Sequence, residues 1–375
     1  RPDGRVGARN LVGVIPSVTC ANDVAQAIVT EVQGTVGYFH HQGCCQLPPD
    51  LDRVTETLTS LGQSPNLGAV LIVSLGCEGT DFEKMYKTIE ATGKPVRIIG
   101  IQELGGVSNA IQKGIDLARQ LVIEISGQQR QPASIEEVVM AIKCGASDTT
   151  SGMASNCVIG YIADKLVDLG ATVIFGETTE FIGGEHLLAR RAVTPEVGQK
   201  IFDIVNAMET RAKSLGCDMR KGQPTPGNIA GGLSSIEEKT LGAIVKSGTR
   251  PIQGVLDYPE LVTTQKGLWI KDTPGREPEI LTGMAATGAQ FMMFSTGRGA
   301  PQGFPSMPVI KICGNPNTFE RMKNDMDINA GLIITGDKTI EEVGEEAFQK
   351  LLRVLGGEMT KNEAIKYFTS IDIHC

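Results

Sequence analysis

The first third of the chain alternates short, continuously apolar runs with amphipathic stretches of helical period. The apolar runs cover residues 11–16, 34–39, 67–74 and 96–101. Strands that are apolar on both faces occur in parallel sheets that are covered by helices on each side. The helical patterns between the runs, over residues 22–32, 51–61 and 81–91 and then up to about residue 125, supply that cover. We therefore predict an α/β fold with a doubly wound parallel sheet.

A polar, turn-rich segment over residues 126–132 interrupts this pattern. The 375 residues exceed the size of one ordinary domain, and such segments commonly form domain boundaries. We predict a Rossmann-like α/β domain over residues 1–128 and a second, larger α/β domain over residues 129–375. In the second unit, strands are expected at residues 138–142, 171–175, 268–271, 291–294 and 309–312.

Charge and composition exclude several classes of function. The net charge is −8 and Lys and Arg form no block, so neither a nucleic acid nor an anionic membrane is an expected partner. No apolar run approaches the ~20 residues of a transmembrane helix, and residues 1–5 lack the apolar core of a secretory signal. The nine cysteines lack the dense spacing of a disulfide scaffold. We expect a soluble cytoplasmic protein.

The ends of the predicted strands carry residue types that bind ligands. Open parallel sheets bind ligands beyond the carboxyl ends of their strands. In the first domain these ends deliver Cys20, residues 40–46, Cys77 with Glu78, and Gln102 with Glu103. Soft and acidic groups thus gather at one edge, as in a metal site. The alternative is that free cysteine acts there as a small buried hydrophobic residue.

A run of hydroxyl residues lies between a predicted strand and helix of the second domain. Its residues are Ser147, Asp148, Thr149, Thr150 and Ser151. Hydroxyls and exposed amides at the start of a helix suit a carboxylate, sulfonate or phosphate, although the Gly-Lys-Ser/Thr ending of a Walker loop is absent. The alternative is an ordinary helix N-cap formed by Asp148 or Ser151.

Two further segments follow strands of the second domain. Arg298 lies in a glycine-flanked loop, where a guanidinium group can clamp a carboxylate or sulfonate. Residues 175–186 carry Glu180, Glu185 and His186, which can share acid and base roles or ligate an ion. The alternative for Glu185 and His186 is the exposed first turn of a helix. Residues 324–329 lack the features of an EF-hand and indicate a turn or helix cap.

Several motifs in order give the chain a family resemblance. They include residues 3–10, 143–152, 177–186, 226–228, 231–239, 272–275, 295–299 and 325–329. With these motifs the chain resembles the altronate/galactarate dehydratase family, over essentially its whole length. This family also contains the large subunit of (2R)-sulfolactate sulfo-lyase. Residues 147–152 and 313–316 look closer to the sulfo-lyase, whereas Cys44, Cys77 and Gln102 look closer to the dehydratases.

The resemblance implies a lyase that performs β-elimination on a small anionic hydroxy acid. The expected reaction is dehydration of a sugar acid such as altronate or galactarate to a 2-keto-3-deoxy acid, with release of sulfite from sulfolactate as the alternative. The family is associated with a divalent metal, expected to be iron(II) (Fe2+), with Mn2+ or Mg2+ as alternatives. The resemblance does not include the small N-terminal domain of galactarate dehydratase, so we expect either that this domain is a separate small subunit or that it was removed from this sequence. The protein is expected to be an oligomer.

With that resemblance, three groups of site residues are predicted. The metal ligands are His40, Cys44 and Cys77, with Cys144 as a further candidate, because thiolate and imidazole suit iron(II). The catalytic acid and base are sought among Glu180, His186 and Glu185. The substrate is held by Ser147, Asp148, Thr149, Thr150, Ser151, Asn228 and Arg298. A non-catalytic subunit that binds a metal or an acid is the third functional alternative, but such a protein has no need of the acid–base candidates.

Overall fold

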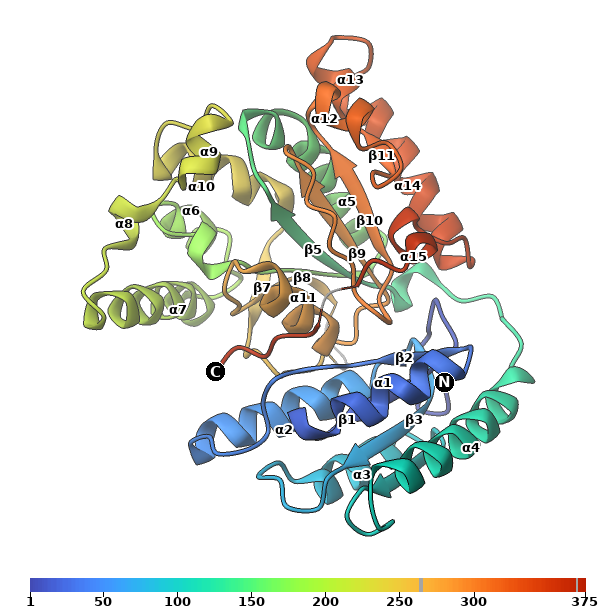
Figure 1. Ribbon diagram of the computed structural model, residues 1–375. Coiled ribbons are helices and arrows are strands. Elements are labelled where there is room, and N and C mark those ends of the chain that lie inside the picture. Colours follow the sequence, from blue (N-terminus) through green and yellow to red (C-terminus); the bar gives the residue numbers. More distant parts are fainter. Residues whose placement is uncertain (263–265, 369) are drawn as a thin grey trace.

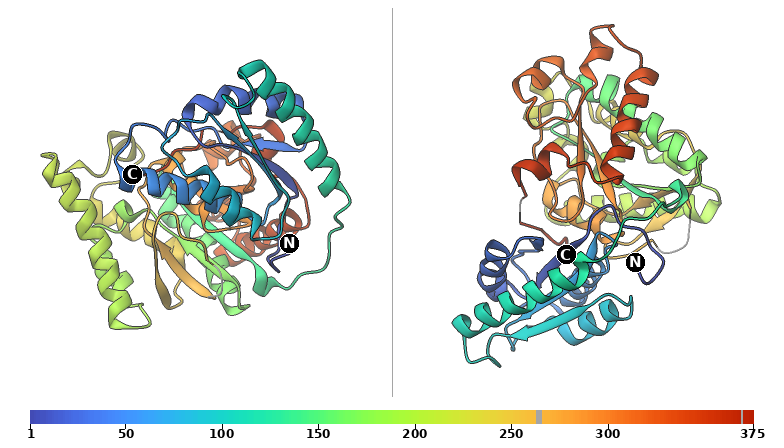
Figure 2. Two further views of the ribbon diagram at one scale, coloured as in Figure 1. Left: turned by 90° about the horizontal axis from the view of Figure 1, so that it is seen from below. Right: turned by 90° about the vertical axis from the view of Figure 1, so that its right-hand side faces the viewer.

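The computed structural model describes residues 1–262, 266–368 and 370–375. Two parallel sheets with helices around them form two stacked units, as Figure 1 shows, so the predicted α/β fold is confirmed. The blue and cyan N-terminal unit lies below the larger unit. In the second view of Figure 2 the C-terminal segment runs between the two units.

The first sheet has four parallel strands in the order β2-β1-β3-β4. These are β1 (Leu11–Pro16), β2 (Thr35–Gly37), β3 (Leu67–Ser74) and β4 (Val96–Gly100). The connecting helices are α1 (Asn22–Glu31), α2 (Pro48–Gly62), α3 (Phe82–Glu90) and α4 (Val107–Ser126). All eight residues of β3 are buried, as expected for a strand that is covered on both faces.

The second sheet has seven parallel strands in the order β11-β10-β9-β5-β6-β8-β7. These are β5 (Val139–Gly145), β6 (Thr172–Phe175), β7 (Ile252–Leu256), β8 (Gly267–Lys271), β9 (Phe291–Thr296), β10 (Val309–Cys313) and β11 (Ile328–Asn329). The five strands expected from the sequence in this unit are all present.

The α-helices of the second unit vary greatly in length. They are α5 (Asn156–Asp168), α6 (Glu185–Ala189), α7 (Pro195–Ser214), α8 (Met219–Gly222), α9 (Pro226–Ala230), α10 (Ile236–Ile244), α11 (Glu277–Ala286), α12 (Pro316–Arg321), α13 (Gly331–Ile334), α14 (Ile340–Leu355) and α15 (Lys361–Ile365). A short π-helix, η3 (Ser151–Ser155), precedes α5, and 3-10 turns η4 (Thr178–Glu180) and η5 (Val245–Ser247) lie near the ends of β6 and α10.

Three groups of buried apolar side chains hold these layers together. One lies between the second sheet and α5, α7 and α14, and another between the first sheet and α1 and α4. The third joins the units, because it contains residues of α2, α11 and both sheets. The C-terminal segment adds to that junction: the Ile371 amide donates to the Phe39 carbonyl at 2.9 Å, and Gln42 Nε2 donates to the Ile373 carbonyl at 2.9 Å.

The strand order of the second sheet determines where a ligand can enter. Strands β6, β8 and β7 lie on one side of β5, and β9, β10 and β11 lie on the other. The junction of β5 and β9 is therefore a topological switch point, where neighbouring loops diverge and leave a crevice beyond the carboxyl ends of the strands. Among the described residues, no helix is long and apolar enough to cross a membrane.

Candidate functional site

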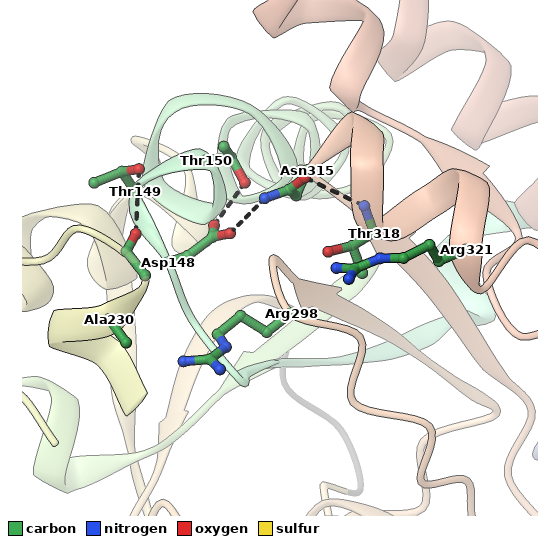
Figure 3. Close-up of a pocket in the computed structure, with 9 residues that line it drawn as sticks. Asp148, Thr149, Thr150, Ala230, Arg298, Asn315, Thr318 and Arg321 are labelled. Atoms are coloured by element: carbon green, nitrogen blue, oxygen red, sulfur yellow. Dashed lines mark hydrogen bonds between the residues drawn. The ribbon is translucent and has the colours of Figure 1, made fainter. Parts of the chain in front are cut away.

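A cavity lies at this switch point, beyond the carboxyl ends of β5, β9 and β10 (Figure 3). Its volume is about 360 Å³, and its lining residues are Asp148, Thr149, Thr150, Ala230, Gly231, Arg298, Asn315, Thr318 and Arg321. A second cavity of about 530 Å³ adjoins it and shares Asp148 and Thr149 with it. We call them the arginine cavity and the lysine cavity, since Lys239 lines the second.

Glycine allows the loops around the arginine cavity to approach closely. A Cβ atom on Gly297 would lie 1.9 Å from Oδ1 of Asp148, and one on Gly314 would lie 2.6 Å from the carbonyl oxygen of Thr150. These distances are shorter than any real Cβ contact, so the loops after β9 and β10 can meet the loop after β5 only with glycine at these positions.

The carboxylate of Asp148 organises the hydroxyl loop. Its Oδ1 accepts from the Thr150 hydroxyl at 2.6 Å and from the Ser151 amide at 3.1 Å, and its Oδ2 accepts from Asn315 Nδ2 at 3.0 Å. The bond to the amide three residues ahead has the geometry of a helix cap. Asp148 thus lines the cavity, but both of its oxygens serve the loop, as the helix-cap alternative expected, rather than being free for a ligand.

The other predicted substrate-binding residues separate into two sets. Thr149 and Thr150 line the arginine cavity together with Arg298, and Ser147 and Ser151 line the lysine cavity. Asn228 does not line either cavity; its Nδ2 donates to the Ser147 carbonyl at 3.0 Å and thereby supports the hydroxyl loop. The structure therefore divides the four hydroxyls between two adjoining cavities, places Arg298 in the first, and gives Asn228 a supporting place.

The sequence analysis missed Arg321, which lies at the end of α12 and lines the arginine cavity. Arg298 donates through Nη1 to the Gly227 carbonyl, and both arginines are exposed. Neither forms an ion pair with an acid in the described part of the chain. The sequence did carry a signal for Arg321, because α12 directly follows the end of a predicted strand, at residues 313–316. To use that signal, one must also know that β10 lies beside β9 in the sheet.

Glu180 does not itself line the lysine cavity, but it forms an ion pair with Lys239, which does. It ends η4 after β6, and its Oε1 lies 3.0 Å from Nζ of Lys239 on α10. Both side chains are nearly buried, at 13% and 10% exposure, and Lys239 lines the cavity. The ion pair lies where a carboxylate and an ammonium group can exchange a proton with each other and with a ligand.

Glu185 and His186 occupy α6 and line neither cavity. Glu185 accepts from the Gly183 amide at 2.6 Å and pairs with Arg220 at 3.3 Å, while His186 is exposed. The structure does not bring either residue to Glu180 and Lys239. Their place is the exposed first turn of a helix, which was the alternative for these two residues.

A buried charge cluster lies directly behind this site. Glu177 has left-handed backbone angles with φ at 71° and is 1% exposed. Its carboxylate lies 2.8 Å from Lys246 Nζ, 3.4 Å from Lys143 Nζ and 3.3 Å from Cys144 Sγ. Burial opposes ionisation of Glu177, but the two lysines outweigh that effect and lower the pKa of the carboxyl group.

The predicted metal-ligand set is not assembled in the described part of the chain. His40 is buried; its Nε2 contacts the Pro16 carbonyl at 2.8 Å, and its Nδ1 accepts from the Gln42 amide at 3.2 Å, so both ring nitrogens are engaged. Cys44 and Cys77 are exposed in neighbouring loops. A hydrogen bond from the Gly79 amide to the Gly43 carbonyl joins these loops. Cys144 belongs to the second sheet, and burial, then the nearby Glu177, raises the pKa of its thiol to about 12.

No three His, Cys, Asp or Glu side chains among the described residues are grouped so that they could hold a metal ion. Two features of the arrangement separate the predicted ligands. The His40 ring uses both nitrogens for backbone contacts, and Cys144 lies in a different sheet from the other three. The metal-ligand set therefore stays a prediction.

Comparisons with known proteins place these features in a family. Residues 135–373 match the family described as D-galactarate/altronate dehydratase, C-terminal, and residues 1–126 match D-galactarate dehydratase/altronate hydrolase, second domain. The chain is 39% identical over 369 residues to the (2R)-sulfolactate sulfo-lyase subunit beta of Chromohalobacter salexigens, covering 97% of this chain and 93% of that one.

Two dehydratases are also similar. The galactarate dehydratase (L-threo-forming) of Escherichia coli is 34% identical, with 95% of this chain and 72% of that protein covered. The altronate dehydratase of Bacillus subtilis is 30% identical, with 97% and 74% covered.

Proposed function

The chain belongs to the D-galactarate/altronate dehydratase family and is a lyase, and on this basis we propose that it performs β-elimination on a small anionic 2-hydroxy acid bound across the arginine and lysine cavities. The observation that carries the proposal is that hydroxyls and an arginine, which has no acidic partner among the described residues, adjoin the ion pair of Lys239 and Glu180. One part of this arrangement suits an anion, and the other suits proton transfer.

The proposed reaction starts at the carbon next to the substrate carboxylate. A base removes the proton from that carbon, the leaving group departs from the next carbon with the bonding electrons, and the resulting enol becomes a 2-keto acid. The proton is too weakly acidic to leave unless the charge that develops on the carboxylate is stabilised. Cationic groups aimed at that carboxylate lower the barrier more than they strengthen ground-state binding.

In the proposed arrangement, Arg298 and the Thr149 hydroxyl hold the carboxylate. Lys239 is the member of the ion pair that faces the substrate, and Glu180 is its partner for the proton. In this step Lys239 first passes a proton to the Glu180 carboxylate, and the resulting neutral amine then takes the α proton. The products of the step are a protonated Glu180 and an ammonium group beside the developing enolate, where its charge stabilises the enolate. Glu180 was expected from the sequence as acid or base, and Lys239 gives it a route to the cavity.

Two substrates are candidates. Sugar-acid dehydration is supported by relatives named galactarate and altronate dehydratase. Loss of sulfite from sulfolactate is favoured by the greater identity, 39% against 30–34%, to a sulfo-lyase subunit. That relative is named a subunit, and we propose that this chain likewise works with a separate small subunit, in an oligomeric assembly.

A divalent ion, Fe2+ with Mn2+ or Mg2+ as alternatives, remains a prediction. Of the residues expected to hold it, His40 engages both ring nitrogens with the backbone and Cys144 lies in the other sheet, while Cys44 and Cys77 are exposed in neighbouring loops. Metal analysis of anaerobically purified protein, beside activity before and after chelation, tests the prediction.

The proposed function is tested by turnover on a panel that contains galactarate, altronate and (2R)-sulfolactate, with 2-keto acid and sulfite both assayed. We expect one acid to release a 2-keto acid, and Lys239→Met and Glu180→Gln to abolish the reaction while the Arg298 site still binds the acid. Retention of turnover in both variants would refute the assignment of the ion pair.

A further inference from the structure

The arginine cavity holds two guanidinium groups from different elements. Arg298 follows β9 and lies beside Ala230, and Arg321 ends α12 and lies beside Thr318, as Figure 3 shows. The chain has 43 acidic residues against 35 Lys and Arg, so acidic partners are abundant. Two arginines that line one cavity without an acidic partner among the described residues therefore point to a ligand with negative charge.

Asp148, the acidic residue in the lining, does not serve as that partner. Its two oxygens already accept three hydrogen bonds at 3.1 Å or less, from Thr150, Ser151 and Asn315. The Asp148 carboxylate offsets part of the positive charge at a distance. Arg298 uses one donor on the Gly227 carbonyl, and the other donors of the two guanidinium groups remain available. Those donors are the part of an arginine that recognises a carboxylate or sulfonate.

Packing holds the backbone segments that carry the two arginines against each other. Gly299, next to Arg298, lies so close to α12 that an added Cβ atom would lie 2.3 Å from Sδ of Met322 and 3.1 Å from Cγ2 of Thr318. The loop that carries Arg298 and the helix that carries Arg321 therefore pack as one unit. Two cationic side chains that extend from this unit into one cavity suit a ligand with two anionic groups.

We propose that Arg321 binds a second anionic group of the substrate and makes this lyase selective for dianionic 2-hydroxy acids. This inference rests on the proposed function and deepens it. The substrate class has a carboxylate at the reacting end and a second carboxylate or a sulfonate at the other end. Arg298 holds the first group, and Arg321 discriminates against acids that end in a neutral hydroxymethyl group.

The experiment compares kcat/KM of wild type, Arg321→Gln and Arg298→Gln on galactarate, (2R)-sulfolactate and the monoanion altronate. The control is Lys323→Gln, which removes an exposed charge two residues further on. For the dianion that is turned over, we expect Arg321→Gln to lower kcat/KM by about 10- to 100-fold, the usual effect of losing a charge-assisted hydrogen bond. For altronate, we expect kcat/KM to change by less than about 3-fold. Arg298→Gln is expected to weaken both classes. If Arg321→Gln lowers kcat/KM for galactarate and not for sulfolactate, the second group is a carboxylate. The reverse result identifies a sulfonate.

Calorimetric binding of the same acids keeps this test separate from the test of the proposed function. If wild type binds a dianion but turns over none, the proposed function fails, and loss of that binding in Arg321→Gln still supports the inference. The inference would be overturned if Arg321→Gln lowered kcat/KM equally for dianions and for altronate, or changed neither. A wild-type enzyme with a higher kcat/KM for altronate than for the dianions would overturn it as well.

Discussion

The substitution Glu177→Gln tests whether the buried charge cluster holds the second domain together. Glutamine keeps the shape of the side chain but removes the charge between Lys246 and Lys143, which are both fully buried. Removal of one partner from a buried ion pair typically costs about 3–5 kcal/mol, because the other charge stays in a poorly solvating environment. Here Glu277 lies 3.5 Å from Lys143 Nζ and retains part of the balance, so we expect a loss of about 3 kcal/mol.

The assay is urea unfolding at pH 7, followed by tryptophan fluorescence. Trp269 is the one tryptophan of the chain and lies in β8, two strands from β5, so it reports on the affected sheet. The matched control is Glu185→Gln, which removes the partly exposed pair with Arg220, and such pairs contribute about 0–1 kcal/mol.

The double variant Glu177→Gln/Lys246→Met removes both charges of the shortest pair. It should lose less than the sum of the two single losses, because the partners interact directly. A loss in Glu177→Gln that does not exceed the loss in Glu185→Gln would refute the reasoning.

Three further outcomes follow from the structure. Lys239→Met and Glu180→Gln should each abolish exchange of the substrate α proton with deuterated solvent, whereas His186→Ala and Glu185→Gln should keep near wild-type kcat, as measured by NMR and steady-state kinetics. Gly297→Ala should raise KM by at least about 10-fold with the fold intact by circular dichroism, since its Cβ would displace Asp148 and the hydroxyl loop. Burial lowers the pKa of His40 to about 4, below the ~6.5 of an unfolded histidine, so its contribution to stability is present above pH ~6.5 and is lost as the pH falls towards 4. Urea unfolding of wild type and His40→Gln between pH 4 and 7 should show a shallower pH dependence in the variant.

Apolar runs predicted the strands well where burial alone determines them. β3 is an eight-residue run buried at every position, and its bounds match the prediction. The two-residue β11 and the irregular β7, whose pairing shifts between Ile252 and Gly254, carry too little pattern to be found without their neighbours. The twenty-residue α7 was also missed, although Thr194 caps it and Pro195 begins it, which is a start signal readable from sequence.

The candidate site was predictable as far as local sequence determines it. Ser147, Thr149, Thr150 and Arg298 follow strands, and the carboxyl ends of parallel strands share one edge, so their meeting could be foreseen. The approach of Arg321 depends on β10 lying beside β9, and strand order cannot be read from periodicity. The expected roles of His40 and His186 rested on residue type and on position after a predicted strand. Neither gives the backbone partners of a ring or the direction of a side chain.

Polar residues follow the strands of both sheets, but the hydrogen bonds and ion pairs of these residues differ between the two sheets. In the first unit, Glu78 accepts from the Ser17 hydroxyl at 2.6 Å and from the Gly76 amide at 2.6 Å, and His40 engages both nitrogens with the backbone. These groups stabilise their loops and have little capacity left for a ligand. In the second unit the same kind of edge leaves Arg298 and Arg321 without acidic partners in the described chain. Guanidinium groups that line a cavity without an acidic partner can bind a carboxylate or sulfonate, so we expect the substrate at the second edge.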